Sequence, residues 1–157
     1  MRAWFKTGFN FGLSSGVITT IGLMVGLFAG THSTEVVLAG IITIAFADAF
    51  SDAFGIHVSQ ESVNGLSHRE VWYTTIVTFL AKLVFALSFV IPILLFSLPV
   101  AMIVSLVWAL LLIVSANIVI ARGERCSPMR VVGEHLLFAL VVVAVTYYVG
   151  VWVDTLF

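Results

Sequence analysis

Five long apolar stretches, separated by short polar segments, dominate the pattern of this sequence. They cover about residues 7–30, 36–58, 71–96, 99–121 and 132–153. A helix of about 20 apolar residues crosses a hydrocarbon core of about 30 Å, so each stretch is long enough to span a membrane. The pattern therefore predicts an all-α membrane protein in which residues 1–157 form a single domain of five transmembrane helices.

Two prolines refine the expected helix boundaries. Pro92 lies inside the third stretch and is expected to kink or end that helix, because proline lacks a backbone N–H. Ser127 followed by Pro128 predicts the start of the fifth helix, with the serine as its cap and the proline at its first position.

Composition supports a membrane protein and excludes several other classes. Hydrophobic residues make up 61% of the chain and charged residues 10%, and the mean hydropathy is +1.18. This leaves no room for a soluble catalytic domain, and no H-E-x-x-H motif is present, so we expect neither an enzyme nor a bound cofactor. The net charge of −1 argues against a nucleic-acid partner. The single cysteine, Cys126, excludes an internal disulfide.

Basic residues predict the orientation of the helices. Arginine and lysine in short loops are retained on the cytoplasmic side of a membrane. With five crossings, one side receives Arg2, Lys6, Arg69, Arg122, Arg125 and Arg130. We therefore expect a multi-pass protein with a cytoplasmic N-terminus and the C-terminus on the opposite side, in the plasma or inner membrane if the source is prokaryotic.

Glycines recur at every fourth position of the first stretch. Gly12 and Gly16 form one such pair, and Gly22 and Gly26 form another. Small residues at this spacing let helix backbones approach closely. They predict either tight packing within the bundle or a contact across a symmetric dimer, and the sequence alone leaves both open.

Three ionisable residues fall deep inside the predicted spans. Asp48 and Asp52 are four residues apart and share one face of the second helix, about 6 Å from each other. Counted from the inner helix ends at about 1.5 Å per residue, Asp48 lies about 18 Å deep, Asp52 about 12 Å and Lys82 about 15 Å. Charges at such depth are costly and indicate a functional site, although a buried ion pair with Lys82 is the structural alternative. One lysine cannot neutralise both aspartates, so a proton or metal ion is still expected.

Other polar residues extend this candidate metal site. Ser15 of the first helix lies at the depth of Asp52, where its hydroxyl could complete a coordination shell; bonding to its own helix backbone is the alternative. His57 and Glu61 form a second pair nearer the inner end of the second helix. Carboxylates suit hard divalent ions, and an imidazole shifts the preference toward iron, manganese, cobalt or zinc.

Three segments of the chain resemble the vacuolar iron transporter family, including its yeast-type and nodulin-like members. The first is GLSSGVITTIGLMVG, residues 12–26, and the second is LAGIITIAFADAFSDAFGIHVSQES, residues 38–62. The third, Thr146–Gly150, resembles the T-Y-x-x-G stretch of the family's last helix. The resemblance implies a homodimer of five-helix subunits that exports metal from the cytosol in exchange for protons, with the ion pathway between the first two helices.

The chain departs from the family pattern at three positions. Ser15 stands where the family has an aspartate, Asp52 where it has a methionine, and Ile56 where it has a glutamate. The short stretch 61–70 replaces the cytoplasmic metal-binding helices that many members insert. The chain therefore resembles a divergent, minimal member in which Asp52 restores, at the same depth, the carboxylate missing at Ser15.

These observations lead to one functional prediction and one alternative. The prediction is a proton-coupled transporter of ferrous iron or manganese, with Asp48, Asp52, Ser15, His57 and Glu61 as metal ligands. Asp52 and Lys82 would couple metal to protons, with Lys82 as the counter-charge. The alternative is a non-transporting structural or regulatory membrane protein in which the buried Asp and Lys residues are charge pairs.

Overall fold

The structure is a computed structural model that describes residues 2–63, 65–121 and 128–156. Within these residues it contains the helices α1 (Ala3–Thr31), α2 (Thr34–Glu61), α3 (His68–Ser88), α4 (Val90–Leu95), α5 (Leu98–Ala121) and α6 (Pro128–Asp154). Because α3 and α4 together form one span, five segments are long and apolar enough to cross a membrane. The predicted all-helical fold with five spans is confirmed, and it is compatible with a multi-pass membrane protein.

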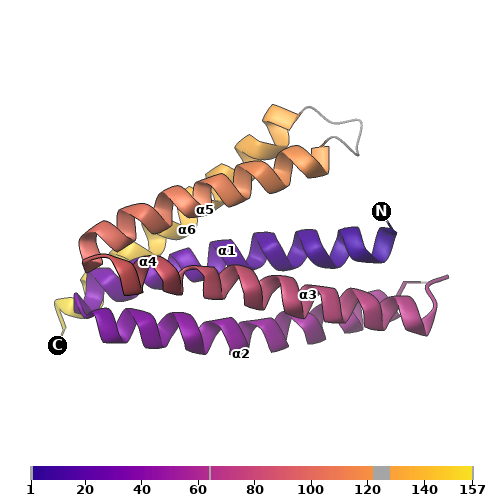
Figure 1. Ribbon diagram of the computed structural model, residues 1–157, viewed down its shortest axis with the longest axis horizontal. Helices are drawn as coiled ribbons and strands as arrows, with labels where there is room; N and C mark the ends of the chain where they lie inside the picture. Colours follow the sequence, from indigo (N-terminus) through magenta and orange to yellow (C-terminus); the bar gives the residue numbers. More distant parts are fainter. Residues whose placement is uncertain (1, 64, 122–127, 157) are drawn as a thin grey trace.

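The helices run roughly along one axis, with α1 at the centre of the bundle. Figure 1 shows α1, α2 and α3 side by side, while α5 and α6 lean away from them toward the end that holds the N-terminus. The two termini lie at opposite ends, as an odd number of spans requires. Of the spans, α1 is the most buried and α6 the least. The buried core centres on Val17, Ile21 and Met24 of α1.

Three arginines lie at the N-terminal end of the bundle. Arg2 precedes α1, Arg69 lies in the first turn of α3, and Arg130 lies in the first turn of α6. All three positions belong to the same end of the molecule (Figure 1). Arg122 and Arg125, which we predicted for this end, lie outside the described residues, as does Cys126. Which membrane side this end faces stays a prediction.

Helices extend a few residues beyond the predicted apolar stretches. The start of α3 has a clear local cause: this helix begins at His68 rather than at residue 71. Ser67 accepts a hydrogen bond from the backbone N–H of Glu70, and the Glu70 side chain accepts one from the backbone N–H of Ser67. This capping box satisfies two free donors of the first turn. The predicted cap Ser127 lies outside the described residues, and α6 begins at Pro128.

The third span breaks just before Pro92. Helix α3 ends at Ser88 and α4 begins at Val90, so the break falls three to four residues ahead of the proline. A residue at position 92 would normally donate its N–H to the carbonyl of Ser88, and proline has no N–H to give. The interruption therefore agrees with the predicted kink.

Two glycine runs of α1 pack against different helices of the same chain. A Cβ atom on Gly12 would lie 2.6 Å from the carbonyl oxygen of Thr78 in α3. A Cβ atom on Gly26 would lie 3.2 Å from the carbonyl oxygen of Thr146 in α6. The first half of α1 therefore needs glycine to approach α3, and the second half needs it to approach α6.

Candidate ion-binding site

Helices α1, α2 and α3 bring four polar side chains together in the middle of the bundle. Ser15 comes from α1, Asp48 and Asp52 come from α2, and Lys82 comes from α3. Lys82 is only 1% exposed, although it is one of the longest side chains of the chain. Its stem fits beside α1 because position 16 is glycine: a Cβ atom there would lie 3.1 Å from Lys82 Cγ.

The ammonium group of Lys82 is the centre of this cluster. Its Nζ atom donates a short hydrogen bond to Oδ2 of Asp52 and another, of 2.8 Å, to Oγ of Ser15. It also forms an ion pair of 2.5 Å with Oδ2 of Asp48, which lacks the alignment of a hydrogen bond. Ser15 in turn donates to Asp52 Oδ2 at 2.6 Å. The predicted match in depth between Ser15 and Asp52 is thus a direct contact.

The charges of this cluster do not balance. In their ionised forms, one lysine and two aspartates leave one negative charge inside a predicted membrane span. The two carboxylates are also the accessible part of the cluster: the side chains of Asp48 and Asp52 are 25% and 22% exposed, against 1% for Lys82. A proton or cation that approaches from outside the bundle would therefore contact the carboxylates before Lys82, which is buried.

His57 and Glu61 form a second, separate pair nearer the basic end of α2. His57 Nε2 lies 3.4 Å from Glu61 Oε1. His57 Nδ1 lies 2.9 Å from Oγ1 of Thr75, and that hydroxyl already donates its proton to the carbonyl oxygen of Val71. With that hydroxyl directed at Val71, the tautomer that has its proton on Nδ1 fits the contact with Thr75, and Nε2 faces the Glu61 carboxylate.

The five predicted metal ligands thus divide into two groups along α2. Ser15, Asp48 and Asp52 gather around Lys82, while His57 and Glu61 lie about 8 Å and about 14 Å farther along the helix axis, counted from Asp52. In the part of the chain that the structure describes, no three His, Cys, Asp or Glu side chains lie close enough together to hold a metal ion. Metal binding by these residues stays a prediction.

Several other polar residues of the spans bond within their own helices. Thr19 Oγ1 donates to the carbonyl oxygen of Ser15, and Asn117 Nδ2 donates to that of Ile113. Glu134 pairs with Arg130 at 3.0 Å on the exposed surface of α6. These contacts are structural, as expected for residues outside the site. Thr75, by contrast, is a site residue that the sequence analysis missed.

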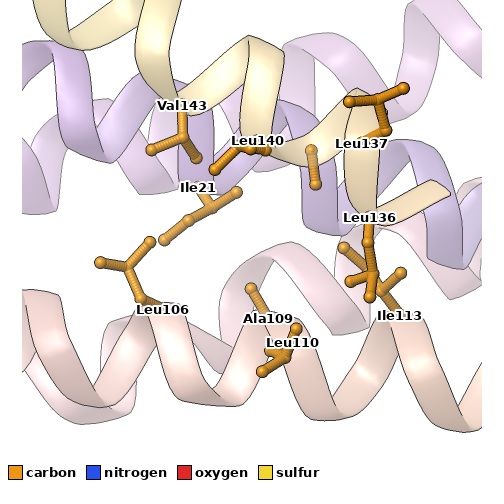
Figure 2. A pocket seen from close by; sticks show the side chains of 10 residues that line it. Ile21, Leu106, Ala109, Leu110, Ile113, Leu136, Leu137, Leu140 and Val143 are labelled. Carbon is orange, nitrogen blue, oxygen red and sulfur yellow. The ribbon is translucent and has the colours of Figure 1, made fainter. Parts of the chain in front are cut away.

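A well-formed cleft elsewhere in the bundle has no ionisable lining. It has a volume of about 360 Å³ and lies between α5, α6 and α1, where Figure 2 shows Ile21, Leu110 and Leu140 among the aliphatic side chains around it. A site without oxygen or nitrogen ligands cannot replace the hydration shell of a cation. The cluster around Lys82 is therefore the stronger candidate for ion binding.

Comparison with known proteins identifies no family for this chain. No protein-family model matches the sequence, and no curated protein matches it. Functional inference therefore rests on the geometry of the site and on the resemblance of its three segments.

Proposed function

We propose that this chain is a proton-coupled transporter of divalent metal cations, rather than an enzyme, and that it resembles the vacuolar iron transporters in exporting ferrous iron or manganese from the cytoplasm. The observation that carries the proposal is the unbalanced charge of two carboxylates on one buried lysine. Intramembrane charge is costly, and a cluster with one charge left over is suited to bind a mobile cation.

In this proposal, the Lys82 ammonium holds the place of the metal ion between the carboxylates. It already lies within contact distance of Asp48, Asp52 and Ser15, the oxygen donors that a hard cation would use. A divalent ion can bind both carboxylates only when the ammonium loses its proton or withdraws, because two cations at one point repel each other. Metal loading would thus release a proton, and reprotonation would expel the metal.

His57 and Glu61 would receive the ion at the cytoplasmic mouth of the pathway. Thr75 orients the imidazole of His57 so that Nε2 faces the Glu61 carboxylate. One imidazole nitrogen and one carboxylate form a weak, open pair of ligands. Such a pair suits transient capture of iron or manganese before the ion passes to the aspartates.

We also propose a homodimer that covers the accessible edge of the acidic pair. One row of exposed residues on α2, next to the exposed phenylalanines of the same helix, consists of small residues at every fourth position: Ala39, Thr43, Ala47, Ser51, Gly55 and Ser59. A Cβ atom on Gly55 would meet nothing within 4 Å. Small residues at this spacing favour close helix contact, and carboxylates that are a quarter exposed would otherwise face lipid.

A structural or regulatory membrane protein is the second candidate. Two observations favour it. Lys82 is buried, and its ammonium group already contacts Asp48, Asp52 and Ser15. No group of three metal-ligating side chains occurs among the described residues. In that case the cluster only fixes the register of α1, α2 and α3. Buried ion pairs contribute little net stability, so specificity of packing would be their role.

Flux measurements in proteoliposomes distinguish the two candidates. We expect manganese or ferrous iron added outside the vesicles to drive proton movement with the unmodified protein and not with Asp52→Asn. Asp154→Asn, which changes an exposed acid at the end of α6, is the matched control and should retain the flux. The absence of metal-driven proton movement in the unmodified protein, or full activity of Asp52→Asn, would refute the transport proposal.

A further inference from the structure

A polar cleft lies between the first turns of α1 and α3, away from the acidic cluster. Its volume is about 570 Å³. It differs in character from the aliphatic cleft of Figure 2, because it is lined by Arg2, Ala3, Trp4, Ser67, Arg69, Glu70 and Tyr73. Neither the ion-binding cluster nor the His57–Glu61 pair uses any of these residues.

The lining of this cleft is positively charged. Arg2 and Arg69 contribute two guanidinium groups, and Glu70 offsets one of their charges. One oxygen of Glu70 is already engaged, since Oε2 accepts hydrogen bonds from the Ser67 backbone N–H at 3.0 Å and from Ser67 Oγ at 2.7 Å. Within the described part of the chain, no carboxylate lies within ion-pair distance of Arg69. Its five donors are therefore available to a bound anion.

The N-terminus of α1 adds to this positive potential. The first turn of α1 contains no acidic residue, and Arg2 at its N-cap provides no side-chain hydrogen bond. The N–H groups of Phe5 and Lys6 donate to the carbonyl oxygen of Arg2, and the N–H groups before them carry the positive end of the helix dipole without a side-chain cap. The neighbouring first turn of α3 is capped by Ser67 and Glu70. The first turn of α1 is therefore the side of the cleft whose backbone N–H groups have no side-chain cap.

Aromatic residues place the cleft at the level of lipid headgroups. Trp4 of α1 packs against Tyr73 of α3, with ring centroids 5.0 Å apart. Tryptophan and tyrosine concentrate at the boundary between hydrocarbon and water. Beyond Tyr73, the outer face of α3 continues toward the middle of the span with Ile76, Leu80 and Val84, which are 49%, 51% and 61% exposed. A ligand in the cleft thus borders an apolar track long enough for acyl chains.

We infer that this cleft binds the phosphate of an anionic phospholipid, with its acyl chains along the exposed face of α3. Arginine recognises phosphate through paired hydrogen bonds, which a zwitterionic headgroup would offset with its own cation. The exposed stripe from Ile76 to Val84 favours a lipid over a free anion. The bound headgroup would bridge the first turns of α1 and α3 and hold together the two helices that carry Ser15 and Lys82.

Thermal unfolding of the purified protein in detergent tests this inference. The probes are dioleoyl phosphatidylglycerol, dioleoyl phosphatidylcholine and inorganic phosphate, each added to the full chain. We expect phosphatidylglycerol to raise the unfolding midpoint by several degrees more than phosphatidylcholine, as a ligand that binds only the folded state does. The double variant Arg2→Gln, Arg69→Gln should lose that difference.

Arg130→Gln is the matched control, because Arg130 lies at the same end of the bundle, is exposed, and pairs with Glu134 on α6 instead of lining the cleft. It should respond to phosphatidylglycerol like the unmodified protein. An equal response of the double variant, or an equal effect of phosphatidylcholine, would overturn the inference. A full shift with inorganic phosphate alone would also overturn it, since the site would then bind a free anion and not a lipid.

Discussion

Gly16 of α1 lies directly against Lys82 of α3, so that a Cβ atom at position 16 would come within 3.1 Å of both Cγ and the backbone oxygen of the lysine. The lysine stem passes through space that any other residue would fill. Beyond that point, its ammonium reaches Asp48, Asp52 and Ser15. One glycine of the first helix therefore determines whether the buried charge cluster can assemble.

Replacement of Gly16 by valine should destabilise the protein. The added side chain must displace Lys82 or the α3 backbone, and overpacking of this kind costs about 1–3 kcal/mol. Gly133→Val on α6 is the control, because a Cβ atom there meets nothing within 4 Å. Denaturant unfolding in detergent micelles would measure both. Equal losses in the two variants would indicate that helix propensity, and not contact with Lys82, explains the effect.

The Ser15 hydroxyl should contribute measurably to the stability of the cluster. It accepts a hydrogen bond from Lys82 and donates one to Asp52, so Ser15→Ala leaves a buried ammonium and a partly exposed carboxylate with one partner fewer. We expect a loss of about 1–3 kcal/mol in unfolding free energy. Ser14→Ala removes the neighbouring hydroxyl, which forms no hydrogen bond within the described residues, and should change stability by much less. A neutral Ser15→Ala variant would contradict the assigned contacts.

Thr75 should affect metal binding through His57 without contacting the metal itself. Thr75→Val preserves shape and removes the hydroxyl that bonds His57 Nδ1, so the imidazole loses its fixed orientation. Loss of such a supporting contact lowers metal affinity by roughly 10-fold or more. Manganese-dependent thermal stabilisation would measure it. Thr74→Val is the control, since that hydroxyl bonds only the backbone of its own helix; an equal effect there would refute the role of Thr75.

Much of the fold could be predicted from the sequence because membrane spans are a property of local composition. The five apolar stretches and the break before Pro92 follow from residue type and spacing alone. The apolar stretch begins at residue 71, after the polar capping box of Ser67 and Glu70, so it predicts the start of α3 three residues late. That S-x-x-E signal was present in the sequence, and its capping chemistry would have given the boundary.

The sequence predicts how deep each site residue lies along its helix, and it therefore predicts only those contacts that follow from equal depth. Ser15 and Asp52 were expected at one level, and they are hydrogen-bonded. Which helices lie side by side is a property of the whole bundle. For that reason the sequence could not show that one glycine run faces α3 and the other α6, or that Thr75 faces His57. Contacts between helices depend on rotation about each axis, which the pattern of an all-apolar span hardly specifies.

Lys82→Met provides the sharpest separation of the two candidate functions. The variant leaves Asp48 and Asp52 without their counter-charge, and removal of one partner from a buried ion pair costs about 3–5 kcal/mol, less here because both carboxylates are partly exposed. If the cluster is a metal site, manganese should take the place of the ammonium and restore the lost stability. Its binding should also depend less on pH than in the unmodified protein, because the competing proton on Lys82 is gone. Unfolding midpoints measured with and without manganese at two pH values would test both expectations. If the cluster only fixes helix register, manganese should restore nothing, whereas the double variant Lys82→Met, Asp48→Asn should recover part of the stability by removing one uncompensated charge.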